Sequence, residues 1–247
     1  SYISRRAVCL VLAAILLFAP VMIALPHTAE AATTITKSVN LTNPRKNIAG
    51  AGYTWMNLDK TLYLEGLHID TQDEYGMRIP DGATVILEGN NYISAASYAL
   101  GCPSNVTFKG NGSLTLVARD TGLYFYSTDD TTTARILGGT YTISSGGVGI
   151  RSDYTTLSIT GGKLLSTEGN VITFTKKDDK AVIPGNFVTG GTYYKVPTAY
   201  VPTYCVIRDN RDNTYSVISA YLLTFQANGG RGTMETVSVD VGTEYTL

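Results

Sequence analysis

Apolar residues recur at fixed positions before a glycine over most of the chain, from about residue 61 to residue 191. The repeated unit is an apolar residue, any residue, an apolar residue, any residue and a glycine, and it occurs six times, at Gly66, Gly89, Gly110, Gly138, Gly161 and Gly185. The apolar positions are Leu64, Leu87, Phe108, Ile136, Ile159 and Ile183 two residues before the glycine, and Leu62, Val85, Val106, Ala134, Leu157 and Ala181 four residues before it. Alternation with period two predicts strands that bury one face.

A second apolar series lies between these glycines. Its members are Met77, Leu100, Leu123, Ile150 and Val171, each followed two residues later by Ile79, Cys102, Phe125, Ser152 and Thr173. The glycines are 21 to 28 residues apart, and a repeat of this length is typical of stacked coils. We therefore predict an all-β fold: a right-handed, single-stranded parallel β-helix of about six coils over residues 61–191, with helix confined largely to the first 31 residues.

Each coil of such a fold must turn sharply at the same place. Glycine and asparagine tolerate positive φ, and the repeated glycines begin the pairs Gly89-Asn90, Gly110-Asn111, Gly138-Gly139, Gly161-Gly162 and Gly185-Asn186. The longest step contains the polar stretch 127–133, which we expect to bulge from the coils as a loop.

The segments on either side of the repeats are expected to close the stack. An open stack of coils exposes an apolar end that must be covered. We interpret residues 32–60 as an N-terminal segment and cap that includes Trp55; the alternative is a tryptophan that stacks on sugar. Residues 192–220 are predicted to form a proline-punctuated connector and a hairpin around the polar turn 209–213.

The first 31 residues have the features of a secretory signal peptide. Arg5 and Arg6 precede an apolar run, and Ala29-Glu30-Ala31 places small residues where signal peptidase cleaves. The alternative is a membrane anchor, since the run is nearly long enough to span a bilayer. The signal-peptide interpretation predicts a secreted or cell-surface protein with no membrane association after cleavage.

A specific motif lies near the C-terminal end, in residues 221–247. Phe225, Ala227, Asn228, Gly229 and Gly230 are followed by Gly232-Thr233-Met234. This run resembles the opening of an internalin-type B repeat, of the Listeria/Bacteroides repeat family. The aromatic second half of that repeat is not in the sequence, so we expect a partial repeat without a folded core of its own. The resemblance implies a secreted or wall-attached bacterial protein.

The coils are also similar to the β-helical carbohydrate-binding-type domains of secreted bacterial proteins. Runs such as 110–116 and 157–162 carry this similarity. It implies that the ligand is an extracellular polysaccharide, or a host or cell-wall glycan.

Charge and cysteine content exclude some classes of function. Without the signal peptide the chain has 17 basic and 19 acidic residues, so we expect no nucleic-acid partner. Cys102 and Cys205 are too many layers apart to form a disulfide, and we expect two free thiols. The chain has 17 tyrosines but only 6 phenylalanines, which suits strands whose outer face meets water.

Outward tyrosines are the candidate ligand-binding residues. Tyr75 and Tyr98 have matched positions in neighbouring coils, and Tyr124 and Tyr126 lie near the bulged loop, so these rings could stack on sugars along the coils. Arg151 is added as a candidate on the same side. The alternative is a set of ordinary solvent-facing tyrosines.

Acidic residues provide a candidate metal site. Asp129 and Asp130 in the loop, with Asp153 one coil further on, could donate oxygen ligands to calcium, the one cofactor that we consider. The alternative is a set of solvated loop acids.

The sequence provides little evidence for catalysis. Glu65 and Glu88 are predicted to be neighbours in one outward column that continues with Lys109, near the carboxyl spacing of retaining glycosidases. We favour a solvated charge ladder, because nothing apolar evidently covers either residue. His68 is the one histidine after the signal peptide, and no serine or acid forms a motif with it.

Three functions follow from this pattern. The first is a secreted or cell-surface, non-catalytic binding or adhesion protein for extracellular polysaccharide. The second is a polysaccharide lyase or glycoside hydrolase that acts on acidic glycans, and the third is a structural stalk of a larger surface protein. Fold alone does not choose among them.

Overall fold

The computed structural model describes residues 33–103, 105–128, 132–166, 170–175, 187–223, 231–232 and 237–240. The expected signal peptide lies outside these residues, as do Phe225 to Gly230 of the B-repeat motif. The regular secondary structure of the described chain is almost entirely strand; its helical residues form one short 3-10 turn, Thr198–Tyr200.

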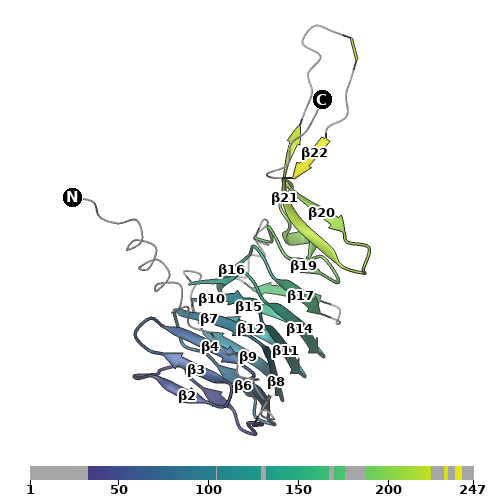
Figure 1. The fold of residues 1–247 in the computed structure, drawn as a ribbon. Coiled ribbons are helices and arrows are strands. Elements are labelled where there is room, and N and C mark those ends of the chain that lie inside the picture. Colours follow the sequence, from purple (N-terminus) through teal and green to yellow (C-terminus); the bar gives the residue numbers. More distant parts are fainter. Residues whose placement is uncertain are drawn as a thin grey trace, which may run out of the picture. The chain divides into compact units, whose positions relative to one another are not determined.

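Three sheets of mainly parallel strands make up the fold, and each coil contributes one strand to each sheet (Figure 1). Sheet 1 contains β4 (Thr61–Glu65), β7 (Ala83–Glu88), β10 (Val106–Gly110), β13 (Thr132–Ile136) and β16 (Thr155–Ile159). Sheet 2 contains β5 (His68–Asp70), β8 (Asn90–Ala95), β11 (Ser113–Ala118), β14 (Thr140–Ser145), β17 (Lys163–Ser166) and β19 (Thr192–Tyr193). Sheet 3 contains β1 (Val39–Asn40), β6 (Tyr75–Arg78), β9 (Tyr98–Pro103), β12 (Thr121–Tyr126), β15 (Val148–Asp153) and β18 (Asn170–Thr175). The prediction of a parallel β-helix is confirmed.

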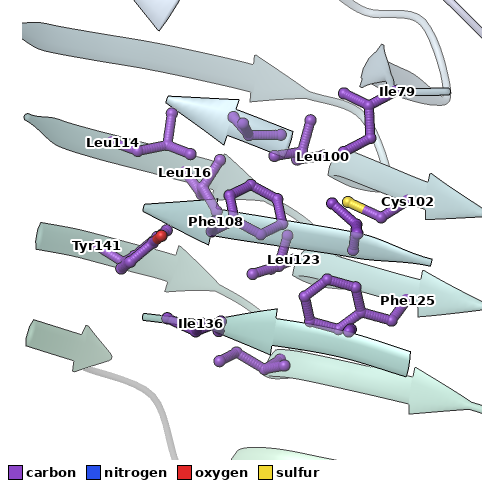
Figure 2. Packing of buried hydrophobic residues seen from close by; sticks show 14 of the residues in the cluster. Ile79, Leu100, Cys102, Phe108, Leu114, Leu116, Leu123, Phe125, Ile136 and Tyr141 are labelled. Carbon is purple, nitrogen blue, oxygen red and sulfur yellow. The ribbon is translucent and has the colours of Figure 1, made fainter. Parts of the chain in front are cut away.

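The space between the three sheets is filled by apolar side chains that stack from coil to coil. One stack, which we call the inner row, consists of Leu62, Val85, Phe108, Ile136, Ile159 and Val188, all with no exposed surface. The Phe108 ring meets the rings of Phe125 and Tyr141 edge to face, at 6.1 and 6.2 Å between centroids (Figure 2). Burial of such a side chain contributes about 1.5–3 kcal/mol.

The register of the inner row differs from the predicted one at a single step. Phe108 lies opposite Val85, two residues from the expected partner Leu87, which lies opposite Gly110. A shift of two residues keeps every side chain on its own face, so the alternation in the sequence cannot detect it. Lys109 consequently lies opposite Ile86 and does not continue the column of Glu65 and Glu88, which was wrongly predicted.

The last coil also departs from the predicted positions. Val188 bridges to Ile159, the place that the sequence had given to Ile183, a residue outside the described part of the chain. In sheet 3, Ile172 lies opposite Ile150, and Phe174 opposite Ser152. The expected positions, Val171 and Thr173, are therefore wrong by one residue.

The turns between sheets 1 and 2 confirm the need for glycine. Positive φ occurs at Gly89, Gly110, Gly139 and Gly162, and also at Gly191 in the last coil. At several turns a buried side chain from the next strand donates a hydrogen bond to a carbonyl oxygen of the turn. The Tyr141 hydroxyl donates to the Gly138 carbonyl (3.0 Å), the Tyr193 hydroxyl to that of Gly190 (2.8 Å), and Asn91 Nδ2 to that of Glu88 (3.0 Å).

The N-terminal segment begins the coils earlier than predicted. Ile35 bridges to Ile69, and β1 pairs in parallel with β6. Next, β2 (Ile48–Gly50) and β3 (Tyr53–Met56) add to β4 as antiparallel strands at the edge of sheet 1. Trp55 is 2% exposed, so its ring belongs to the core and is closed to a sugar ligand.

The predicted hairpin is confirmed at the other end of the coils. Strands β20 (Cys205–Asp209) and β21 (Tyr215–Leu223) are antiparallel, and β21 pairs with β19 of sheet 2. A further strand, β22 (Val237–Asp240), pairs with the end of β21. Cys102 is buried and Cys205 is partly buried, and both are free thiols as expected.

Candidate functional site

The outer side of sheet 3 brings together the aromatic residues that were predicted to bind a ligand. Tyr75 of β6, Tyr98 of β9, and Tyr124 and Tyr126 of β12 are all partly exposed. Rings of adjacent members lie 4.8 Å apart for Tyr75 and Tyr98, 4.9 Å for Tyr98 and Tyr124, and 5.0 Å for Tyr124 and Tyr126. The first distance follows the strand spacing of about 4.8 Å, because Tyr75 and Tyr98 are register partners in neighbouring coils. Tyr98 pairs with Thr121 in the register, so its contact with Tyr124 is diagonal, and Tyr124 and Tyr126 are two residues apart on one strand.

A bend in each coil explains why Tyr75 and Arg78 both face outward although three positions separate them. Gly76 and Met77 between them are buried. A Cβ atom at Gly76 would lie 2.3 Å from Cγ2 of Ile93, so the chain turns into the core at a residue without a side chain. In the strand register, Ala99 and Gly122 are at the position equivalent to Gly76 in the next two coils.

Gly101 creates the space in which the Tyr75 ring lies. It faces outward between Arg78 and Tyr124 in the strand register. A Cβ atom at Gly101 would be 2.8 Å from the Tyr75 ring carbons. The ring therefore covers the glycine backbone and reaches its stacking partner in the next coil.

Two arginines flank the tyrosines. The Arg78 guanidinium carbon lies 4.2 Å from the Tyr75 ring centroid, and that of Arg151 lies 5.3 Å from the Tyr124 centroid. Both distances are within the range of cation–π attraction. We call the four tyrosines together with Arg78 and Arg151 the tyrosine–arginine face. Arg78 was not predicted as a site residue, because it is three coils away from Arg151 in the same outward column. The stacked tyrosines lie between the two arginines and contact both.

Arg151 is held by an acid from its own strand. Its Nε and Nη2 atoms each lie 2.8 Å from Oδ2 of Asp153, and the Tyr124 hydroxyl donates to the same oxygen at 3.0 Å. Asp153 is largely buried, with its side chain 11% exposed, whereas the Arg151 side chain is 38% exposed. Asp153 therefore positions Arg151 and Tyr124 from beneath.

In the stack of these four tyrosines, which we call the ladder, neighbouring rings cover one another's faces. Tyr98 has Tyr75 on one face and Tyr124 on the other, and Arg78 covers Tyr75. The prediction that successive rings stack on sugars is not supported by this arrangement, because a sugar cannot reach both faces of Tyr98. The ring edges, and those hydroxyl groups and guanidinium nitrogens that Asp153 does not engage, are the groups that remain available to a ligand.

The electrostatic environment keeps the phenols protonated. Partial burial raises the pKa values of Tyr75, Tyr98 and Tyr126. Burial, followed by the charge of Asp153, raises the pKa of Tyr124 most strongly. At neutral pH the face thus presents neutral hydroxyls, which donate and accept, and guanidiniums, which only donate.

The predicted calcium site is only partly within the described chain. Asp129 and Asp130 lie outside it, and Oδ2 of Asp153 is engaged by Arg151 and Tyr124. No group of three or more His, Cys, Asp or Glu side chains suited to a metal ion occurs among the described residues.

The candidate catalytic carboxylates are neighbours, as predicted. Glu65 lies opposite Glu88 across β4 and β7, but both are exposed. A carboxyl that acts as a general acid near neutral pH needs burial to raise its pKa, and solvent exposure does not supply it. His68 stacks on Tyr92 at 4.8 Å between ring centroids, a contact between neighbouring coils of sheet 2.

Comparison of the chain with protein-family models, with curated proteins and with solved structures gave no match. Within the described ranges, no helix is long and apolar enough to cross a membrane.

Proposed function

We propose that this chain is a secreted or cell-surface bacterial protein that binds extracellular polysaccharide without cleaving it. The observation that carries the proposal is the tyrosine–arginine face, where four phenols and two guanidiniums from four coils gather on one sheet. Polar side chains repeated at a fixed spacing suit a ligand that is itself a repeating chain of hydroxyl-bearing units.

Rigidity supports the same proposal. The ladder tyrosines contact each other, the guanidiniums lie against the rings, and Asp153 holds Arg151. Because these contacts exist before a ligand arrives, little side-chain entropy remains to be lost on binding. The signal-peptide pattern and the resemblance to a B repeat support an extracellular location.

A glycan array with the full chain, with and without calcium, tests the proposal. Each polysaccharide that binds is then incubated with the protein, and its length is measured. Binding with unchanged length is the expected result. Shortened products would instead support an enzyme that acts on acidic glycans, and no binding across the array would favour a structural stalk.

Variants of the ladder connect binding to the face. Tyr98→Ala and Tyr124→Ala each remove a ring with two ring contacts, and we expect both to weaken binding while the protein remains folded. Tyr63→Ala is the matched control, because Tyr63 is 38% exposed on sheet 1. Wild-type affinity in both ladder variants would remove the face from the account.

A further inference from the structure

The two arginines of the tyrosine–arginine face differ in how their charge is balanced. Asp153 neutralises Arg151 at 2.8 Å. Of the described residues, none places a carboxylate within ion-pair distance of Arg78, and its Nε–H is buried without a hydrogen-bond acceptor. The face therefore carries an unbalanced positive charge at Arg78.

The surroundings of Arg78 are aromatic. The Tyr75 ring lies under its guanidinium, and the phenol groups of Tyr75 and Tyr126 are its hydrogen-bonding neighbours. The nearby acids act on other members of the face: Glu74 on Tyr75, and Asp120 on Tyr98. A guanidinium that lacks a carboxylate and is partly shielded from water attracts an anion more strongly than a solvated one.

Guanidinium geometry selects the kind of anion. The planar fork of an arginine can donate two parallel hydrogen bonds to a carboxylate or to a sulfate. A neighbouring phenol hydroxyl can donate a third. Since Arg151 already spends its Nε and one Nη group on the carboxylate of Asp153, whereas the partners of Arg78 among the described residues are the neutral phenols of Tyr75 and Tyr126, Arg78 is the arginine whose charge remains for an anion.

We propose that Arg78, with Tyr126 beside it, binds the carboxylate or sulfate groups of an acidic polysaccharide, and that Arg151 has a positioning role. This inference rests on the proposed binding function and specifies its ligand class. It predicts that the protein distinguishes an acidic polysaccharide from an uncharged one of the same backbone.

Binding to pairs of polymers that share a backbone and differ in charge tests the ligand class. One pair is polygalacturonate and its methyl ester, and the other is dextran sulfate and dextran; the two pairs distinguish a carboxylate from a sulfate. In titrations of the full chain we expect at least one acidic member to bind about tenfold or more tightly than its neutral partner, the effect of one charge-assisted hydrogen bond. Added salt should reduce this preference.

Single substitutions identify the arginine that gives the preference for the acidic polymer. Arg78→Gln should reduce the ratio of acidic to neutral affinity to near one, and Arg78→Lys should restore part of it, because lysine keeps the charge but lacks the fork. Arg135→Gln, at an exposed arginine of sheet 1, is the matched control for loss of one positive charge. We expect Arg151→Gln to retain the preference for the acidic polymer, since its charge is already balanced. Thermal unfolding checks that each variant is folded.

The outcomes separate this inference from the proposed function. If both members of each pair bind with equal affinity, and Tyr98→Ala weakens binding of both, anion binding by Arg78 is overturned and polysaccharide binding by the face stands. A preference that survives Arg78→Gln but disappears in Arg151→Gln or Arg135→Gln would also overturn the inference. Failure of every polymer to bind the wild-type chain would contradict both.

Discussion

The inner row and the tyrosine–arginine face are stacks that run through the same coils in opposite environments. Members of the inner row have no exposed surface, whereas every member of the face is partly exposed. The first stack stabilises each coil against its neighbours by burial, as in other repeat proteins. The second adds ring contacts at the surface, where apolar burial is incomplete.

The difference teaches where this scaffold can carry function. Substitutions in the inner row change the space that all three sheets share, so they are expected to reduce the stability of the fold. Substitutions in the face change partly exposed groups that contact a few neighbouring side chains at the surface. Stability and binding should therefore respond to substitutions of different residues.

Phe108→Ala should have the largest effect on stability. Phe108 is fully buried and meets Phe125 and Tyr141, and the cavity left by its ring costs about 3–5 kcal/mol. Denaturant unfolding of the variant and the wild-type chain measures this loss. A cost below about 1 kcal/mol, the level of a surface substitution, would mean that the inner row does not dominate stability.

Gly110→Ala tests the turn that allows the inner row to stack. Gly110 has φ +107°, and a Cβ atom there would lie 2.3 Å from the Leu87 carbonyl oxygen. Backbone strain and the clash together should reduce stability by about 2–4 kcal/mol.

Gly66→Ala is the matched control for the turn. Its φ is +70°, but a Cβ atom there meets nothing within 4 Å, so strain alone should cost about 1–2 kcal/mol. Equal losses in the two variants would show that the close approach of Gly110 to the preceding coil is unimportant.

The β-helix itself could be predicted from the sequence, because burial of one strand face requires period two and stacking requires a repeat. The register between Val85 and Phe108 could not, since a shift of two residues leaves the apolar pattern unchanged. The pairing follows the 23-residue step from Leu62 to Val85 and from Val85 to Phe108. The spacing of the turn glycines, which had suggested 21 residues for that coil, was the misleading signal.

The candidate site was predictable in part for a similar reason. Tyr75 and Tyr98 are register partners in neighbouring coils and must lie one strand spacing apart, so their proximity follows from the fold. The role of Gly101 depends on where the Tyr75 ring turns, which no periodicity encodes. Arg78 was missed because strand register places it far from Arg151, and its contact with Tyr75 comes from a side-chain conformation.

Tyr98→Ala should reduce stability less than Phe108→Ala or Gly110→Ala. The side chain has two stacked partners, Tyr75 and Tyr124, and such pairs contribute about 0.5–1.5 kcal/mol each. At a partly exposed site we expect a total loss of about 1–2 kcal/mol. A loss as large as that of Phe108→Ala would make the ladder a structural element and weaken its assignment to binding.

Raising the pH should leave stability unchanged near neutrality and should reduce it increasingly above about pH 10. The folded-state pKa values of the ladder tyrosines are raised above the ordinary value of 10.0. Unfolded phenols lose their protons first, so stability is fully present below about pH 10 and is lost as pH rises through the folded values.

Thermal unfolding from pH 7 to 12, with tyrosinate absorbance recorded in parallel, measures this effect. Among the four tyrosines of the face, Tyr124 has the pKa that is raised most, so Tyr124→Phe should make the decline shallower. Ionisation of all tyrosines near pH 10 in a protein that remains folded would contradict the predicted shielding.

Tyrosine-selective chemical labelling, quantified for each residue by mass spectrometry with and without bound polysaccharide, tests the central claim most directly. Tyr63 and Tyr204 are 38% and 52% exposed outside the face and serve as internal controls. A saturating polysaccharide should reduce labelling of Tyr75, Tyr98, Tyr124 and Tyr126 and leave both controls unchanged. Unchanged labelling of these four tyrosines while the polysaccharide is bound, or protection of Tyr63 instead, would contradict the claim.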